Sequence, residues 1–480
     1  MFTRARSIPP RTRARIASGE EVAGPRVHTT LVRSMARQGN RVFGAGTRLG
    51  SRIVAAPGGG GNSLGSSGGW RCRRGPISIP RRLRARGIRP NLARSQRHMA
   101  HVHVESLSQA GGLVEDLGRA KRIGLDCEAA GFHRYSDRLC LVQLSTERVT
   151  YLIDPLAFDP SDLLRGPLQD PAVIVVMHGS DFDLRLLSRD LGIRLRGLYD
   201  TQIAAQIVGE DTLGLAGLLE SRFGIRLSKK FQRADWAERP IGDAMLEYAA
   251  EDTRHLTRLA DWLGAELAEA GRVAWAAEEC RALEDSAGVP PETDEPEDPV
   301  VRIRGSRHLS PRQLTALREA LAWRDDLARS RDRATFRVIA EGPLIEAVAA
   351  NPGTVGELAA IKGFPARLAE EEGAALIERL ARVSRLPDEE LRPYPKSQRR
   401  GAARLTPQME TLAEKLKNAR NRKADEFGLP RGTLLSNAVV LDVARAAPRS
   451  IEALAAVEGV RRWKAEILGE DFLKLIRGSG

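Results

Sequence analysis

Cysteine is scarce in this sequence, and its few residues form no metal-binding or disulfide pattern. The 480 residues include four cysteines, Cys72, Cys127, Cys140 and Cys280, without the CxxC spacing of a zinc site. Long apolar runs are also missing, since no stretch approaches the roughly 20 apolar residues of a membrane span. A secretory signal would need an apolar core, which is absent too. These absences predict a cytoplasmic protein without a membrane segment, a zinc site or a disulfide framework.

Lysine and aspartate are absent from residues 1–98, which are rich in arginine. This arm carries 21 of the 75 basic residues and 2 of the 62 acidic ones, a net charge of +19, whereas the rest of the chain has −6. Without a helical or strand period it cannot bury a core, so we predict a disordered arm. An RNA-binding tail, an Arg-rich transit peptide and translation upstream of the true start remain open explanations. Met99, one residue before the first patterned sequence, favours the third.

Hydrophobic patterning begins after Met99. Four short runs indicate β-strands, and the first three follow one another closely enough for an antiparallel meander: RIGLDCEA, LCLVQLS, VTYLIDP and AVIVVMHG. From Ser180 onward the period becomes helical, with one long helix from about Gly242 to Ala270. Strands followed by helices predict an α/β or α+β domain over residues 100–285, which an acidic, Pro-rich linker at 286–307 ends.

The C-terminal part contains a duplication. AANPGTVGELAAIKG (349–363) and RAAPRSIEALAAVEG (445–459) match at an offset of 96 residues. Two copies at this period indicate a duplicated small domain and not a solenoid. Their helical spacing predicts two small all-α bundles at 308–385 and 405–477, joined by a basic linker at 386–404.

Acidic side chains occur at three places where the predicted elements could bring them together. Asp126 and Glu128 point to the same side of a strand, Asp183 follows a later strand, and Tyr248 and Asp252 share one helix face. If the carboxylates converge, each like-charge pair costs on the order of 4 kcal/mol at a dielectric near 20. Several pairs would then exceed a typical stability of about 5 to 15 kcal/mol. Divalent cations would remove this cost, and an all-oxygen set favours Mg²⁺ or Mn²⁺.

Each motif also has a simpler explanation. Asp126 and Glu128 could be a solvated strand end, Asp183 a residue favoured by a helix dipole, and Tyr248 with Asp252 a surface pair. The order of the three motifs favours the metal centre. Two ions about 3.5 to 4 Å apart can stabilise both the attacking water and the leaving oxygen of an attack on phosphate.

This ordered set resembles the DEDD 3′-5′ exonuclease superfamily, in its tyrosine subclass, and within it the ribonuclease D family. The segments that carry the resemblance are GLDCEAAGFHRYSDRLCLVQLS, HGSDFDLRLL, YDTQIAAQIVG, FQRADWAERPI and LEYAAEDTRHL. It implies a ribonuclease H-like α/β fold, a mixed sheet flanked by helices. The two bundles, the first through LAWRDDLARSRDRATFRVI, resemble helicase-and-RNase-D C-terminal (HRDC) domains, two of which follow the nuclease in that family.

The resemblance also implies roles for individual residues. Two divalent cations would be held by four carboxylates, those of Asp126, Glu128, Asp183 and Asp252. Tyr248 would orient the attacking water or help to deprotonate it.

Three other residues lie in or near the segments that carry the resemblance. Asp181 is excluded from the ligand set, because the family spacing from His178 falls on Asp183. Cys127 stands where the family usually has Thr, but we expect it to face away from the metals and leave activity intact. Asp200 could support the ligands or cap a helix, and we favour the cap.

Basic residues predict where RNA phosphates bind, because phosphate affinity depends on local clusters. The candidate substrate contacts are His178, Lys229, Lys230, Arg233, Arg329, Arg331, Arg333, Arg399 and Arg400. The alternatives are a solvated loop around Lys229 and helical bundles that only brace the nuclease.

These observations predict a monomeric, metal-dependent exoribonuclease that trims RNA from the 3′ end and releases nucleoside 5′-monophosphates. We expect transfer-RNA precursors as substrates and no small-molecule cofactor. One alternative is a DNA-directed 3′-5′ exonuclease of the Werner type, because the catalytic residues do not indicate whether the sugar of the substrate is ribose or deoxyribose. Another is a catalytically silent RNA-binding scaffold, against which the complete set of four carboxylates and a tyrosine argues.

Overall fold

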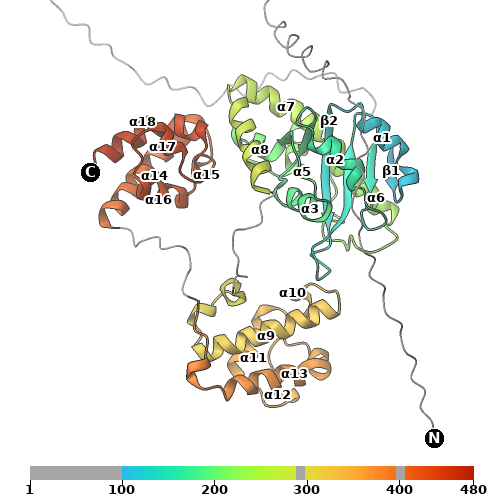
Figure 1. The fold of residues 1–480 in the computed structure, drawn as a ribbon, viewed down its shortest axis with the longest axis vertical. Coiled ribbons are helices and arrows are strands. Elements are labelled where there is room, and N and C mark those ends of the chain that lie inside the picture. The colour runs from blue at the N-terminus through green and yellow to red at the C-terminus, as the bar shows by residue number, and fades with distance from the viewer. Residues whose placement is uncertain (1–99, 288–297, 396–405, 480) are drawn as a thin grey trace, which may run out of the picture. The chain divides into compact units, whose positions relative to one another are not determined.

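The computed structural model describes residues 100–287, 298–395 and 406–479 (Figure 1). The predicted disordered arm lies outside the described residues. So do residues 288–297 of the acidic linker, residues 396–404 of the basic one, which include Arg399 and Arg400, and Leu405.

A mixed six-stranded sheet forms the centre of the first domain, with the strand order β1-β4-β3-β2-β5-β6. Its strands are β1 (His101–Val104), β2 (Arg122–Ala129), β3 (Leu139–Ser145), β4 (Thr150–Ile153), β5 (Ile174–Met177) and β6 (Leu198–Asp200). β2, β3 and β4 pair antiparallel, which confirms the predicted meander. β5 and β6 extend the sheet in parallel beside β2, and β1 pairs in parallel with β4.

Helices flank this sheet (Figure 1). They are α1 (Gly111–Leu117), α2 (Ser161–Gln169), α3 (Asp181–Leu191), α4 (Thr201–Val208), α5 (Leu215–Phe223), α6 (Asp243–Arg254), α7 (Leu256–Glu269) and α8 (Val273–Ala287), with a short 3₁₀ helix η2 (Leu107–Gln109). Both sheet faces are buried, as the alternation along β5 shows. Val175 and Met177 join the core that includes α2 and α3, whereas Val176 packs against α7.

The long helix expected from about Gly242 to Ala270 is two helices, so that prediction was wrong in its continuity. α6 ends at Arg254 and α7 begins at Leu256, with His255 between them at φ −109° and ψ −1°. Buried residues continue at helical spacing through the break, from Thr253 to Leu256 and Leu259. Periodicity alone therefore could not locate the break.

The C-terminal part forms two helical bundles, each with its own buried core. The first comprises η3 (Pro299–Arg302), η4 (Ser306–His308), α9 (Pro311–Ser330), α10 (Thr335–Val338), α11 (Glu341–Ala350), α12 (Val355–Ala359), α13 (Ala366–Ser384) and η5 (Asp388–Glu390). The second comprises α14 (Pro407–Phe427), α15 (Arg431–Leu434), α16 (Asn437–Ala446), α17 (Ile451–Ala455) and α18 (Arg462–Arg477).

The duplication extends to backbone detail at equivalent positions. Thr354 caps the N-terminus of α12 with its side chain, and Ser450 caps α17 in the same way. Gly363 and Gly459 have nearly identical left-handed φ values, +81° and +82°. The sequence repeat therefore corresponds to a repeated structure.

Candidate active site

Strand β2 presents Asp126 and Glu128 to the face of the sheet that α6 covers. The residue between them, Cys127, lies in the opposite core together with Leu125, as strand alternation requires. Gly124 continues the carboxylate side, and a Cβ atom there would meet the carbonyl oxygen of Thr253 on α6 at 2.9 Å. Glycine thus permits α6 to approach β2 closely, and α6 is the helix that carries Tyr248 and Asp252.

Asp183 lies in the first turn of α3, where its side chain is directed into the protein. The residue is only 8% exposed. Asp181, two positions earlier, has a side chain that is 56% exposed and forms an ion pair with Arg185 at 2.8 Å. The structure therefore buries Asp183 and exposes Asp181.

Burial raises the pKa values of all four carboxyl groups, and neighbouring charges raise three of them further. Burial raises the pKa of Asp126 to about 7, and burial together with the charge of Asp126 raises that of Asp252 to about 8. For Glu128, burial and the charges of Asp126, Asp252 and Asp183 raise the pKa to about 10. The pKa of Asp183 is also raised, by burial and by Asp126. The charge of Asp126 thus acts on the other three groups, which places all four in one electrostatic environment.

Tyr248 adjoins the same group. Its ring packs between Phe231, with ring centroids 5.9 Å apart, and Trp236, at 6.1 Å. Burial, followed by the charges of Asp252, Glu128 and Asp126, raises the pKa of its hydroxyl. The hydroxyl is therefore neutral at physiological pH and can donate a hydrogen bond.

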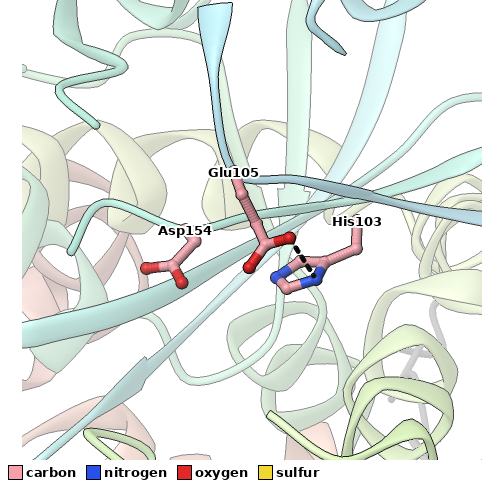
Figure 2. A group of neighbouring side chains, drawn as sticks. All are labelled: His103, Glu105 and Asp154. Carbon is pink, nitrogen blue, oxygen red and sulfur yellow. Dashed lines mark ion pairs between the residues drawn. The ribbon is translucent and has the colours of Figure 1, made fainter. Parts of the chain in front are cut away.

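Elsewhere in the described residues, a second group of possible metal ligands places one ligand atom of each residue within 4.8 Å of the others. This group consists of His103, Glu105 and Asp154 (Figure 2). No three of the four carboxylates around β2, all of which the structure describes, bring ligand atoms within that distance of one another. In the other group, however, Asp154 already accepts hydrogen bonds from Arg239 at 2.6 and 2.8 Å and from the backbone N–H of Leu156 at 2.9 Å. Because a guanidinium already neutralises Asp154, we interpret this group as a structural ion-pair cluster.

The loop between α5 and α6 brings basic side chains beside the site. Lys229, Lys230 and Arg233 are exposed on it. Ring nitrogen Nε2 of His133 lies 2.8 Å from the carbonyl oxygen of Arg233, and Arg134 pairs with Asp235 at 2.9 Å. The loop is thus fastened to the segment that follows β2, while its Phe231 and Trp236 contact Tyr248.

The remaining predicted substrate contacts differ in their surroundings. His178 is half-buried: its Nδ1 lies 2.9 Å from Thr201 Oγ1 and its Nε2 is buried, so neither ring nitrogen is open to RNA and we do not retain it among the RNA contacts. In the first bundle, Arg329 pairs with Asp325 and Arg331 with Glu372, each at 2.8 Å. Arg333 is exposed.

Comparisons with known proteins agree with this arrangement. A 3′-5′ exonuclease family model matches residues 102–268, and the HRDC domain model matches 313–380 and 409–476. The Ribonuclease D of Granulibacter bethesdensis is 31% identical over 372 residues, which cover 76% of this chain and 90% of the relative. The exosome complex exonuclease RRP6 of Saccharomyces cerevisiae is 30% identical over 314 residues, 62% of this chain and 43% of that protein.

A solved structure shows the same fold. The crystal structure of Escherichia coli RNase D aligns with a TM-score of 0.58 and 25% identity, covering 79% of this chain and 99% of that chain. Among the described helices, none has the length and apolar character needed to cross a bilayer.

Proposed function

The chain belongs to the ribonuclease D family and is a 3′-5′ exoribonuclease, and from this premise we propose that the carboxylates around β2 are its catalytic centre. Asp126, Glu128, Asp183 and Asp252 are the metal ligands in this proposal. The observation that carries it is geometric: Asp183 is buried at the start of α3, and the close approach of α6 to Gly124 brings Asp252 to the side of β2 that carries Asp126 and Glu128. The charge of Asp126 acts on the other three carboxyl groups, and a shared cation would relieve that repulsion.

The family uses divalent metal ions, and the donor set fits hard cations. All four candidate ligands supply oxygen, which favours Mg²⁺ or Mn²⁺ over softer metals. Two such ions, when bound, stabilise the negative charge on the attacking and leaving oxygens of phosphodiester hydrolysis. Asp183 reaches the centre from α3 and Asp252 from α6, so two helices and one strand fix the ligand geometry.

Tyr248 orients the attacking water in this proposal. A neutral hydroxyl can donate a hydrogen bond to the water or to the scissile phosphate, and the Phe231 and Trp236 rings hold the tyrosine ring in place. Lys229, Lys230 and Arg233, exposed on the adjoining loop, contact phosphates of the RNA strand. Hydrolysis from the 3′ end then releases nucleoside 5′-monophosphates.

Transfer-RNA precursors with 3′ extensions are the substrate class that we propose for a monomeric enzyme. The Escherichia coli relative is described as an exoribonuclease involved in structured RNA processing, which supports a folded RNA with a single-stranded 3′ end. The first helical bundle would contribute phosphate contacts through Arg329, Arg331 and Arg333. Local basic side chains of this kind supply most of the affinity for a nucleic-acid backbone.

Matched RNA and DNA oligonucleotides labelled at the 5′ end test this function. The full chain with Mg²⁺ should shorten the RNA stepwise and release 5′-monophosphates, and EDTA should abolish the reaction until Mg²⁺ or Mn²⁺ is restored. Asp126→Asn should lose at least about a thousandfold in rate while remaining folded. Faster digestion of the DNA would instead support the Werner-type alternative.

The choice between the neighbouring aspartates has its own control. Asp183→Asn should abolish activity, whereas Asp181→Asn should retain it, because Asp181 is an exposed residue paired with Arg185. The reverse result would show that the second motif was placed on the wrong residue.

A further inference from the structure

Asp200, at the junction of β6 and α4, makes more hydrogen bonds than a helix cap requires. The residue is 1% exposed. Its Oδ1 accepts from the backbone N–H of Gln202 at 2.8 Å and of Ile203 at 3.2 Å, which caps α4 as the sequence predicts. One carboxylate oxygen is enough for that task.

The other bonds of Asp200 go to a different part of the chain. Oδ1 also accepts from the N–H of Gly179 at 3.0 Å, and Oδ2 accepts from both the N–H and the hydroxyl of Ser180, each at 2.8 Å. Three of the five bonds therefore hold the two residues that immediately precede α3. Charge-assisted hydrogen bonds of this kind are stronger than neutral ones.

Ser180 controls where α3 begins. Its carbonyl oxygen accepts the first helical bond, from the N–H of Leu184 at 2.9 Å. Its hydroxyl does not cap α3 and donates instead to Asp200. Asp183 lies within the turn that this bond closes, so the position of Ser180 sets the position of the Asp183 carboxylate.

The turn itself is tightly packed against α4. Gly179 has φ +69°, and a Cβ atom there would meet the side-chain amide of Gln202 at 3.2 Å. Next to Asp200, the Thr201 hydroxyl donates to the Met177 carbonyl oxygen at 2.8 Å and lies 2.9 Å from His178 Nδ1. The start of α4 thus holds the whole connection between β5 and α3.

We propose that Asp200 is a positioning residue, which fixes the Gly179–Ser180 turn and thereby keeps Asp183 at the metal centre. This inference rests on the proposed function, because it takes Asp183 as a metal ligand. Groups that orient metal ligands in this way affect metal affinity, and their loss typically costs 10- to 100-fold.

Two substitutions separate positioning from capping. Asn and Ser are both good N-cap residues, so Asp200→Asn and Asp200→Ser keep an acceptor for α4. Asn has one acceptor oxygen, however, and cannot satisfy both the cap and the Ser180 donors. Ser is too short to reach both. If Asp200 only caps α4, both variants should leave metal binding unchanged.

Calorimetric titration of the full chain with Mn²⁺ alone, without RNA, is the decisive measurement. Both variants should bind Mn²⁺ about 10- to 100-fold more weakly at a temperature where circular dichroism shows them folded. Their turnover should fall at low Mn²⁺ and recover partly at high Mn²⁺. Asp159→Asn is the matched control, because Asp159 accepts from the N–H of Ser161 at the start of α2, away from the site. It should change neither quantity.

Each remaining outcome has a defined meaning. Unchanged Mn²⁺ affinity in both variants, with only a lower melting temperature, overturns the positioning role and leaves the metal centre standing. If the unaltered chain binds no Mn²⁺, the metal centre itself is wrong and this inference fails with it. If neither Asp200 variant folds, Ser180→Ala, which removes one bond at Oδ2, must weaken Mn²⁺ binding by at least about threefold, within the range of one lost hydrogen bond. Unchanged affinity there also overturns the proposal.

Discussion

Gly124 of β2 lies against the main-chain carbonyl of Thr253 on α6, so closely that a Cβ atom would come within 2.9 Å of the oxygen. Gly124 belongs to a strand and Thr253 to a helix, so neither can move away without disturbing the hydrogen bonds of its element. We expect Gly124→Ala to push α6 from the sheet, to cost about 1 to 3 kcal/mol of unfolding free energy, and to lower turnover by displacing Tyr248 and Asp252. Urea denaturation and the exonuclease assay measure the two effects.

Gly432 in α15 provides the control for this substitution. Beyond its two chain neighbours, a Cβ atom there would meet nothing within 4 Å, the residue is exposed, and alanine is the better helix former by about 1 kcal/mol. Gly432→Ala should therefore be neutral or stabilising and fully active. Full activity of Gly124→Ala would show that the close approach of α6 is not needed for the catalytic arrangement.

Removing only the Tyr248 hydroxyl should impair the reaction and leave the fold intact. Tyr248→Phe keeps the ring between Phe231 and Trp236, so stability should change little, while turnover should fall by roughly 10² to 10⁴, the range for acid–base assistance. Mn²⁺ affinity should be nearly unchanged, because the hydroxyl is not a ligand in this proposal. A large loss of Mn²⁺ binding in calorimetry would make Tyr248 a ligand.

Tyr151→Phe is the matched comparison for that substitution. The Tyr151 hydroxyl donates to Asp116 at 2.8 Å, so its removal should lower the melting temperature without changing turnover. Equal losses of turnover in the two variants would indicate a general effect of losing a tyrosine hydroxyl.

The sequence alone could place the candidate ligands Asp126, Glu128 and Asp252, because each belongs to a local pattern. Alternation along β2 places Asp126 and Glu128 together, and helical spacing places Tyr248 and Asp252 together. The three bonds that Asp200 accepts from Gly179 and Ser180 were not predictable, because these two residues lie about twenty positions away and meet it only through the pairing of β5 with β6. The burial of one arginine in the second bundle was not predictable from the sequence either. The structure buries Arg420, 4% exposed, where it donates to the Asn437 side chain at 2.8 Å.

The raised carboxyl pKa values predict how stability changes with pH in the absence of metal ions. In the unfolded chain an aspartate has an ordinary pKa near 4. In the folded chain the pKa is about 7 for Asp126 and about 8 for Asp252. The unfolded chain therefore loses these protons first, and stability should decrease as pH rises from about 4 to 8. Thermal melts in EDTA at several pH values measure this trend.

Metal ions should offset this loss of stability at high pH, and one substitution should make it smaller. Mg²⁺ binds the ionised carboxylates of the fold, so its stabilising effect should be largest at pH 8 and small at pH 5. Asp126→Asn removes one repelling charge and should flatten the pH dependence in EDTA. A metal-free melting temperature that rises steadily between pH 5 and pH 8 would contradict the placement of these four groups in one site.

The last prediction separates RNA binding from bracing in the two helical bundles. If Arg329, Arg331 and Arg333 contact phosphates, each contact contributes about 0.7 to the log–log dependence of affinity on salt for single-stranded RNA. Deleting residues 288–480 should then weaken binding to a folded transfer-RNA precursor with a 3′ extension and flatten its salt dependence by several such units. Short single-stranded oligonucleotides, which reach only the carboxylates, should be cut almost as fast as before.

The full chain with all three arginines changed to glutamine is the control for an indirect effect of the deletion. Arg329 and Arg331 pair with acidic residues of their own bundle, so circular dichroism must first show that the substituted bundle stays folded. A salt slope reduced by about 2 units, roughly 0.7 for each lost contact, would assign phosphate binding to these side chains. Equal slopes for the full, substituted and shortened chains would make the bundles braces for the nuclease, and the proposed transfer-RNA substrate would lose its main physical support.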